Sequence, residues 1–162
     1  MNEVGSTRAG ELALRLRESN EKLIELLNSL SAEQWRQSVP PDGRTVGVLT
    51  HHLSTSHPLV TDIARSVAAG GGIPLTWEAV DEWNAQHAKE HADCEPVDTI
   101  NLLRESTAKA AALIEGFDDE QLERSAPHPL LDGQVTTVAE LLERMTIGHT
   151  QWHLEDIRVA TT

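Results

Sequence analysis

The chain has 162 residues, enough for one domain (residues 1–162) that buries an apolar core without disulfides. Its formal net charge of -13 at pH 7 opposes contact with a phosphate backbone, so we expect no binding to nucleic acid. With one cysteine, no apolar leader and no long apolar run, the chain is expected to be cytoplasmic and not membrane-bound.

The first predicted element is a long amphipathic helix over residues 7–30. Its leucines recur at three- and four-residue steps on one face, at Leu12, Leu16, Leu23, Leu27 and Leu30. Ser31 and Gln34 then form a capping-box pattern that begins a short helix, and the sequence PPDG at 40–43 predicts a turn after it.

A second long helix is predicted to begin near Thr45 and to end at the glycine-rich stretch 69–72. Its inward positions are Val46, Leu49, Leu53, Val60, Ile63 and Val67. Pro58 lies inside it and cannot donate a backbone hydrogen bond to Ser54, so we expect a kink just after His52.

The second half predicts a shorter helix over 76–92 lying across the bundle, a long helix over 97–116, a short one over 118–122 and a last long one. The last helix begins at a capping box formed by Thr137 and Glu140. Its inward positions are Val138, Leu141, Leu142 and Met145.

Residues 29–53 and 116–145 follow the same plan: a helix end, a short helix containing Glu-Gln, a loop with Asp-Gly, and Thr-Val opening the next long helix. This similarity favours paired helical units. The sequence therefore predicts an all-α fold, a four-helix bundle of two helical hairpins with long connections and antiparallel neighbours. A short extra helix lies between helices two and three.

The core face of the last helix continues to positions 149, 152 and 153, so His149 and His153 stack on the inward side. His52 borders Leu49 and Leu53 on the second helix, and the two helices can bring three imidazoles to one ion. Chance alone gives about 0.4 pairs with this spacing. Core histidines or surface residues without a metal are the alternative interpretation.

Three neutral imidazoles would leave a metal such as zinc one open position, as catalytic sites do. Asp156 lies seven residues after His149 on nearly the same face. It can accept the second ring N–H of a ligating histidine, or it can be a solvated charge in the last helical turn.

The remaining histidines are interpreted as structural or exposed. His87 and His91 have the spacing of an inverzincin motif, but their short charged helix favours a solvated face. Trp83, Asn84 and His87 are weaker candidates for the mouth of a pocket, and so for cofactor binding. His51 is expected to be exposed, His57 to lie at the surface near the kink, and His128 in a loop. No Glu-x2-His motif supports a di-iron site.

Several motifs span nearly the whole chain: Thr45-Val46, His52-Leu53, VDEWNAQ at 80–86, Thr137-Val138 and GHTQWHLEDI at 148–157. Together they resemble the DinB-like superfamily of four-helix bundles, which includes mycothiol-dependent maleylpyruvate isomerases and related thiol S-transferases. The resemblance implies a metal-binding triad at His52, His149 and His153. The position of Leu53 and the Thr-Val pair favours His52 over its neighbour His51.

The resemblance implies a transferase or isomerase that uses a divalent metal, zinc or nickel first, and a low-molecular-weight thiol on a small electrophilic substrate. A hydrolase would use the same triad to activate water. A non-enzymatic dimeric bundle that binds a metal or ligand in sensing or stress response is a further alternative. We expect a homodimer. A DNA-damage factor is opposed by the charge, and the acidic neighbours of Cys94 disfavour a nucleophilic thiolate.

Overall fold

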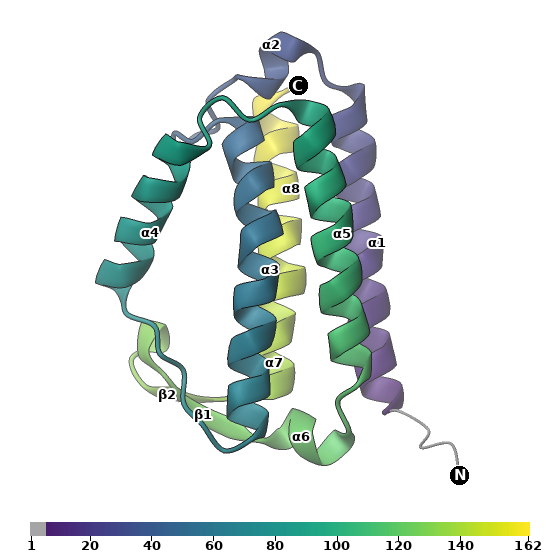
Figure 1. The fold of residues 1–162 in the computed structure, drawn as a ribbon, viewed down its shortest axis with the longest axis vertical. Coiled ribbons are helices and arrows are strands. Elements are labelled where there is room, and N and C mark those ends of the chain that lie inside the picture. Colours follow the sequence, from purple (N-terminus) through teal and green to yellow (C-terminus); the bar gives the residue numbers. More distant parts are fainter. Residues whose placement is uncertain (1–5) are drawn as a thin grey trace.

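The computed structural model describes residues 6–162, in which four long helical segments form a bundle (Figure 1). Three of the segments are α1 (Thr7–Ser29), α3 (Val46–Ala68) and α5 (Pro96–Glu115). The fourth runs through α7 (Val138–Leu142), a π-helical turn (Glu143–Gly148) and α8 (His149–Ala160). Short helices are α2 (Ala32–Trp35), α4 (Trp77–Glu90) and α6 (Asp119–Glu123). The predicted helical bundle with an extra helix between helices two and three is confirmed.

The long helices do not all run antiparallel to their neighbours. In Figure 1, α1 and α8 run upward while α3 and α5 run downward, and α4 carries the chain back to the top between them. Helix α5 packs against both α1 and α3, and α8 packs against both from the other side. The expectation of antiparallel neighbours is therefore wrong for the α3–α5 and α1–α8 pairs, because the α4 connection crosses the full height of the bundle.

The bundle interior is apolar at both ends and polar in the middle. One apolar cluster joins the start of α1 to the ends of α3 and α5, and the other joins the end of α1 to the starts of α3 and α5. Buried polar side chains from all four long segments lie between them: Ser19, Asn20, Ser54, Ser56, His57, Ser106, Thr107, Thr150 and His153. Burial of each large aliphatic side chain in the end clusters contributes about 1.5–3 kcal/mol.

Pro58 lies within α3, which continues from Val46 to Ala68 as one helix. The proline has no N–H to donate to the carbonyl of Ser54. Instead, the Ser106 Oγ of α5 donates a buried hydrogen bond of 2.5 Å to that carbonyl. The polar layer thus satisfies the backbone group that the proline leaves free, and it ties α3 to α5.

Two short strands, which the sequence analysis did not predict, connect α6 to α7. They are β1 (Ser125–His128) and β2 (Gln134–Thr137), paired antiparallel with His128 opposite Gln134. Asp132 and Gly133 both have positive φ at the turn. The expectation that His128 lies in a loop is wrong: it ends β1, is buried, and its Nδ1 accepts a hydrogen bond of 3.2 Å from the Leu130 N–H.

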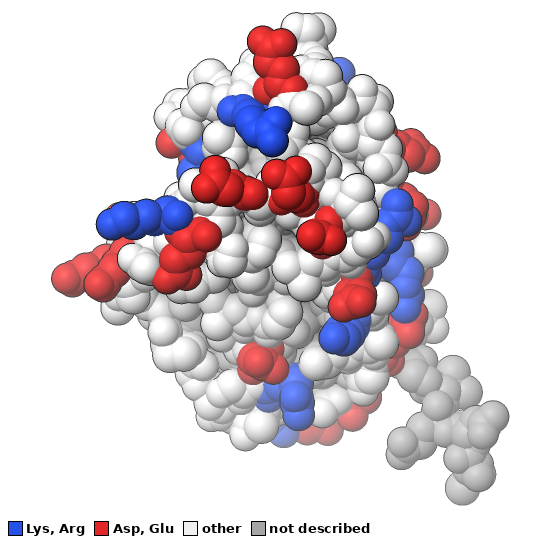
Figure 2. All heavy atoms as spheres, turned by 45° about the horizontal axis from the view of Figure 1, so that its top comes forward, with Lys and Arg blue, Asp and Glu red and all other residues white. Residues whose placement is uncertain are grey.

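The end of the bundle that comes forward in Figure 2 carries acidic and basic side chains interspersed, with no continuous basic patch on this face. Within residues 6–162, none of the helices combines the length and the apolar character needed to cross a membrane.

We predict that Ser106→Ala lowers the free energy of unfolding by about 1–3 kcal/mol, because it leaves the Ser54 carbonyl buried without a donor. Urea denaturation measures this change. In a Pro58→Ala background, the new backbone N–H can pair with the same carbonyl. The Ser106→Ala cost should then fall below about 1 kcal/mol, and equal costs in the two backgrounds would contradict this explanation.

Candidate metal centre

Three histidine rings meet where α3 faces α8. The Nε2 atom of His149 lies 3.3 Å from Nε2 of His52 and 2.9 Å from Nε2 of His153. One ring nitrogen from each residue lies within 4.8 Å of the other two. A tetrahedral ion with metal–nitrogen bonds of 2.0–2.1 Å separates its ligand atoms by about 3.4 Å. The spacing of the three nitrogens therefore fits a common metal ion.

Burial keeps these imidazoles neutral. Desolvation lowers the pKa of His149 to about 4 and that of His153 to about 3, and it holds the pKa of His52 far below its usual value. The neighbouring Arg44 guanidinium shifts all three in the same direction. At pH 7 each ring therefore keeps a lone pair, which is the protonation state that metal binding requires.

The π-helical turn at 143–148 sets the direction of the last two ligands. A π turn inserts an extra residue into the helical repeat and changes which side chains face inward after it. Beyond it, Thr150, His153 and Ile157 are buried, whereas Trp152 is 63% exposed. The sequence analysis placed Trp152 on the inward face, which is wrong because it assumed an uninterrupted α-helix.

Asp156 does not accept a hydrogen bond from a histidine of the triad, which was one of its two predicted roles. It is partly buried, and desolvation followed by repulsion from Asp42 raises its pKa, yet no hydrogen bond joins it to a histidine in the described chain. The Nδ1 atoms of His52 and His153 are buried without a hydrogen-bond partner. The rings are held by packing and not by a carboxylate.

The triad lies in the wall of a cavity of about 580 Å³ between the bundle and α4. Trp83 and Asn84 line this cavity from α4, and Trp152 lines it from α8. Of the three residues predicted at a pocket mouth, His87 instead lines an adjacent cavity of about 370 Å³, which it shares with Trp83. The triad cavity combines apolar walls with a few polar groups, as small-molecule sites do.

Sequence reasoning missed Arg44, which also lines the triad cavity. Its Nε and Nη2 donate hydrogen bonds of 2.6 and 2.7 Å to the Asp42 carboxylate. Its Nη1 is buried and has no partner. The guanidinium thus retains donor capacity beside the three imidazoles. Arg44 lies in the loop three residues after Pro41, where there is no helical periodicity from which its direction could have been predicted.

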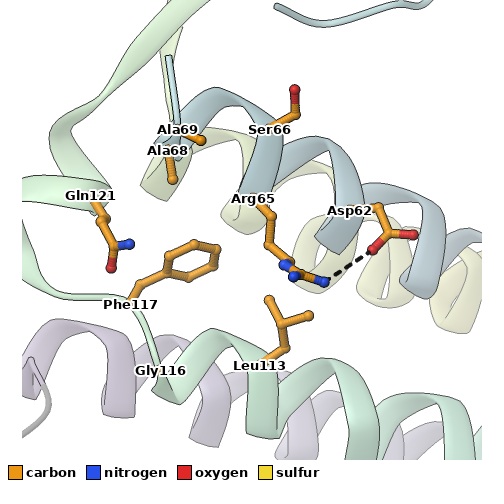
Figure 3. A pocket seen from close by; sticks show the side chains of 9 residues that line it. All are labelled: Asp62, Arg65, Ser66, Ala68, Ala69, Leu113, Gly116, Phe117 and Gln121. Carbon is orange, nitrogen blue, oxygen red and sulfur yellow. Dashed lines mark ion pairs between the residues drawn. The ribbon is translucent and has the colours of Figure 1, made fainter. Parts of the chain in front are cut away.

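A further cavity of about 490 Å³ lies where α3 and α5 end. Figure 3 shows Arg65 and Phe117 directed into it and the Arg65–Asp62 ion pair at its side. Its lining contains neither histidine nor cysteine. The triad cavity is therefore the better candidate for metal chemistry.

Three predictions about the other histidines are wrong. His51 is only partly exposed, and its ring stacks on His91 with centroids 3.7 Å apart. His87 is buried rather than solvated, because α4 turns it toward α3. His57 is fully buried, since it follows Leu53 by four residues and precedes Val60 by three on the same inward stripe.

Cys94 lies just after α4, where its carbonyl accepts a hydrogen bond of 2.9 Å from the Trp35 indole. Burial raises the pKa of its thiol. The side chain is therefore protonated at pH 7 and has a structural position outside the triad cavity.

Comparison with known proteins places the chain in a family. The sequence model of the DinB superfamily matches residues 15–157. The chain belongs to the DinB superfamily. No match was found among curated proteins.

Solved structures show the same fold. YfiT from Bacillus subtilis, described as a probable metal-dependent hydrolase with an unusual four-helix bundle topology, aligns with a TM-score of 0.76 and 21% identity, covering 99% of this chain and 89% of YfiT. The colibactin self-resistance protein ClbS, solved in complex with dsDNA, gives 0.73 and 16%, covering 99% and 97%. A mycothiol-dependent maleylpyruvate isomerase gives 0.72 and 14%, covering 92% of this chain and 60% of the isomerase. At these identities the likeness establishes the DinB fold alone.

The pH dependence of stability of the metal-free protein tests the burial of His57. Both of its ring nitrogens lack partners, and desolvation lowers its pKa from 6.5 to about 3. Between those values the unfolded chain binds a proton that the folded chain does not, so stability falls as the pH falls. His57→Leu should reduce this slope by about 1.4 kcal/mol per pH unit in urea denaturation with chelator present.

Thr107→Val is the matched control, because it also removes a buried polar group without a partner, here a hydroxyl, but no titratable group. It should shift the unfolding free energy equally at every pH. A His57→Leu variant with the wild-type slope would show that His57 is not buried in the neutral form.

Proposed function

We propose that this DinB-superfamily protein is a metal-dependent transferase or isomerase that uses a low-molecular-weight thiol on a small electrophilic substrate. The observation that carries the proposal is the convergence of three neutral imidazole nitrogens on the wall of the 580 Å³ cavity. We propose His52, His149 and His153 as the metal ligands. A set of imidazoles suits zinc and nickel better than the oxygen-seeking ions calcium and magnesium.

When bound at three protein ligands, such an ion supplies a Lewis acid with an open position, which lowers the pKa of a thiol or a water placed there. The chain itself contributes the surroundings. The neutral rings bring no competing proton, and Arg44 places a positive charge beside the position where an anion would bind. Both features favour a thiolate over a neutral ligand.

Arg44 also provides a contact for an anionic group. Because Asp42 occupies Nε and Nη2, the buried Nη1 is the donor left for a carboxylate on the thiol or on the substrate. Asp42 holds the guanidinium plane in place through two parallel hydrogen bonds. We propose Arg44 as a binding residue for an anionic group and assign it no proton transfer.

Helix α4 would form the opposite wall. Trp77, Val80 and Trp83 line the cavity across from the triad, with Asn84 as a polar group among them. These apolar side chains can hold the organic part of a small substrate and exclude water from the reacting atoms. We therefore propose Trp83 and Asn84 as residues that position the thiol or the substrate.

A metal-dependent hydrolase is the second candidate, favoured by the similarity to YfiT. Hydrolysis usually needs a general base near the attacking water. The carboxylates that line the cavity are Asp42, which is paired with Arg44, and Asp81 of α4. A thiolate, in contrast, attacks an electrophile without a general base. The structural similarity to the mycothiol-dependent maleylpyruvate isomerase also supports the thiol reaction. The third candidate function is that of a non-catalytic, homodimeric bundle that binds a metal.

Nucleic acid is not part of the proposal. ClbS was solved with dsDNA, but this chain carries a net charge of -13. Figure 2 shows acidic side chains interspersed with the basic ones on the face in view. Such a surface offers phosphates little attraction at physiological salt.

We predict that His153→Ala abolishes metal binding at the triad, because two neutral imidazoles hold a divalent ion much more weakly than three. Elemental analysis of untagged protein, reconstituted with zinc or nickel and passed through a desalting column, measures the loss of one ion per chain. Thiol-dependent turnover of electrophiles should disappear with it.

His128→Asn is the matched control, since His128 lies outside the triad and the asparagine side-chain oxygen can still accept the Leu130 N–H. It should keep both the ion and the activity. Retention of the same ion content by wild type and His153→Ala would remove the basis of the proposed reaction.

Arg44→Gln should weaken binding of a thiol that carries a carboxylate while leaving the ion in place. Loss of one charge-assisted hydrogen bond predicts about a 10- to 100-fold higher Kd for N-acetylcysteine. The Kd for 2-mercaptoethanol, which has no carboxylate, should rise less, because only the longer-range attraction between the guanidinium and the thiolate is lost. Titration calorimetry on the metal-loaded protein measures both, with the exposed Arg124→Gln as control. Equal effects on both thiols would exclude an anion contact at Arg44.

A further inference from the structure

A second group of three histidines lies between α3 and α4. Its members are His51, which directly precedes His52, His87 of α4, and His91, the residue that follows the last residue of α4. The Nδ1 atom of His51 lies 2.8 Å from Nε2 of His87. One ring nitrogen from each of the three residues lies within 4.8 Å of the other two, the same limit that the triad meets.

The second cluster repeats the construction of the triad. Each consists of one histidine from α3 and an i, i+4 pair from another helix, and the ring centroids of each pair are 4.6 Å apart. The distance from the α3 ring to the first ring of the pair is 5.0 Å in both clusters. They differ in the last pair: His51 and His91 stack nearly parallel, with centroids 3.7 Å apart and 19° between the rings, whereas His52 and His153 meet edge-on at 5.7 Å and 89°. An imidazole lone pair lies in the plane of its ring, so the His51 or His91 ring must rotate about its Cβ–Cγ bond before both can bind one ion.

The chemical surroundings of the second cluster suit a cation. His87 is buried and His51 is partly buried, and a ring nitrogen of each lies within reach of the other. Glu90 lines the adjacent 370 Å³ cavity with His87 and His91, and its negative charge acts on His87. The buried Nδ1 of His87 has no partner within the described chain.

We propose that His51, His87 and His91 form a second metal site, separate from the triad, which binds a divalent transition ion such as zinc, nickel or copper. Imidazole ligands select these ions over magnesium and calcium. The cavity beside His87 and His91 leaves room for a fourth ligand, either water or the Glu90 carboxylate. The site uses none of the three triad residues, so it does not depend on the proposed thiol reaction.

The second ion would fasten α4 to the bundle. His87 is the one buried residue of α4, whereas Trp77 is 60% exposed and Trp83 36% exposed. Ordinary apolar packing therefore holds this helix weakly. An ion shared by His51 of α3 with His87 and His91 cross-links the two helices, and α4 is the wall that closes the triad cavity. Occupancy of the second site would thereby control access to the first.

Metal stoichiometry tests the proposal. Metal-free wild-type protein is loaded with zinc, desalted, and assayed for zinc per chain by elemental analysis. We expect two ions for wild type, one for His91→Ala, one for His153→Ala and none for the double variant. Lys89→Ala, an exposed change on the same helix, is the control and should keep two.

Hydrogen exchange supplies a second measurement that does not depend on activity. In the His153→Ala background, zinc should slow exchange of the amides of residues 77–91 at least about tenfold, because binding stabilises the docked helix. The additional His91→Ala change should abolish that effect. Circular dichroism of each variant verifies that the bundle is folded.

The outcomes separate the two sites. One ion in wild type that His153→Ala loses and His91→Ala keeps would overturn the second site and leave the triad intact. One ion that only His91→Ala loses would support the second site and overturn the triad. One ion lost in both single variants would mean a single shared centre and would also overturn a separate second site.

Discussion

The burial of neutral imidazoles in a polar layer is the constraint on which this structure depends. The bundle is closed by apolar clusters at both ends, but its middle holds serine, threonine, asparagine and histidine side chains. Polar groups removed from water destabilise a fold unless they are paired. Some are paired here, as Ser106 is with the Ser54 carbonyl. Others, such as Nδ1 of His52, are not. This layer therefore costs folding free energy, and it places one ring nitrogen of each of three neutral imidazoles within 4.8 Å of the other two.

Much of this polar layer could be predicted from the helical spacing of apolar residues in the sequence. The leucine stripe of α1 and the Thr-Val openings located the long helices, and the inward face of α3 brought His52 to the same side as His149 and His153. The same inward face contains His57, four residues after Leu53. The prediction that Pro58 kinks the helix placed His57 at the surface, whereas α3 continues through the proline and keeps the residue on its inward face. The helix caps could also be predicted, because the side chains of Ser31 and Thr137 each accept the backbone hydrogen bond that a capping box requires.

Other features depend on contacts between distant residues, which periodicity does not encode. The burial of His87 follows from the path of α4 across the bundle and not from the polar sequence around it. The π turn before His149 leaves hydrophobic spacing nearly unchanged while it rotates Trp152 outward. The strands at 125–137 have only four residues each, too few for an alternating pattern to be recognised in the sequence. The Asp132-Gly133 pair, which has positive φ at both residues, is a typical hairpin turn, but the sequence analysis interpreted it as part of a loop.

The weak attachment of α4 has a consequence for how such proteins diversify. The four long segments pack around the two apolar clusters, whereas α4 contributes no residue to either cluster and buries only His87. Substitutions along its exposed face therefore cost little folding free energy, yet several of its residues form the wall opposite the triad. Residues 77–90 other than His87 can therefore vary without disturbing the apolar clusters of the bundle. A change in this helix would alter the shape of the cavity beside the triad without disturbing the packing of the four long segments.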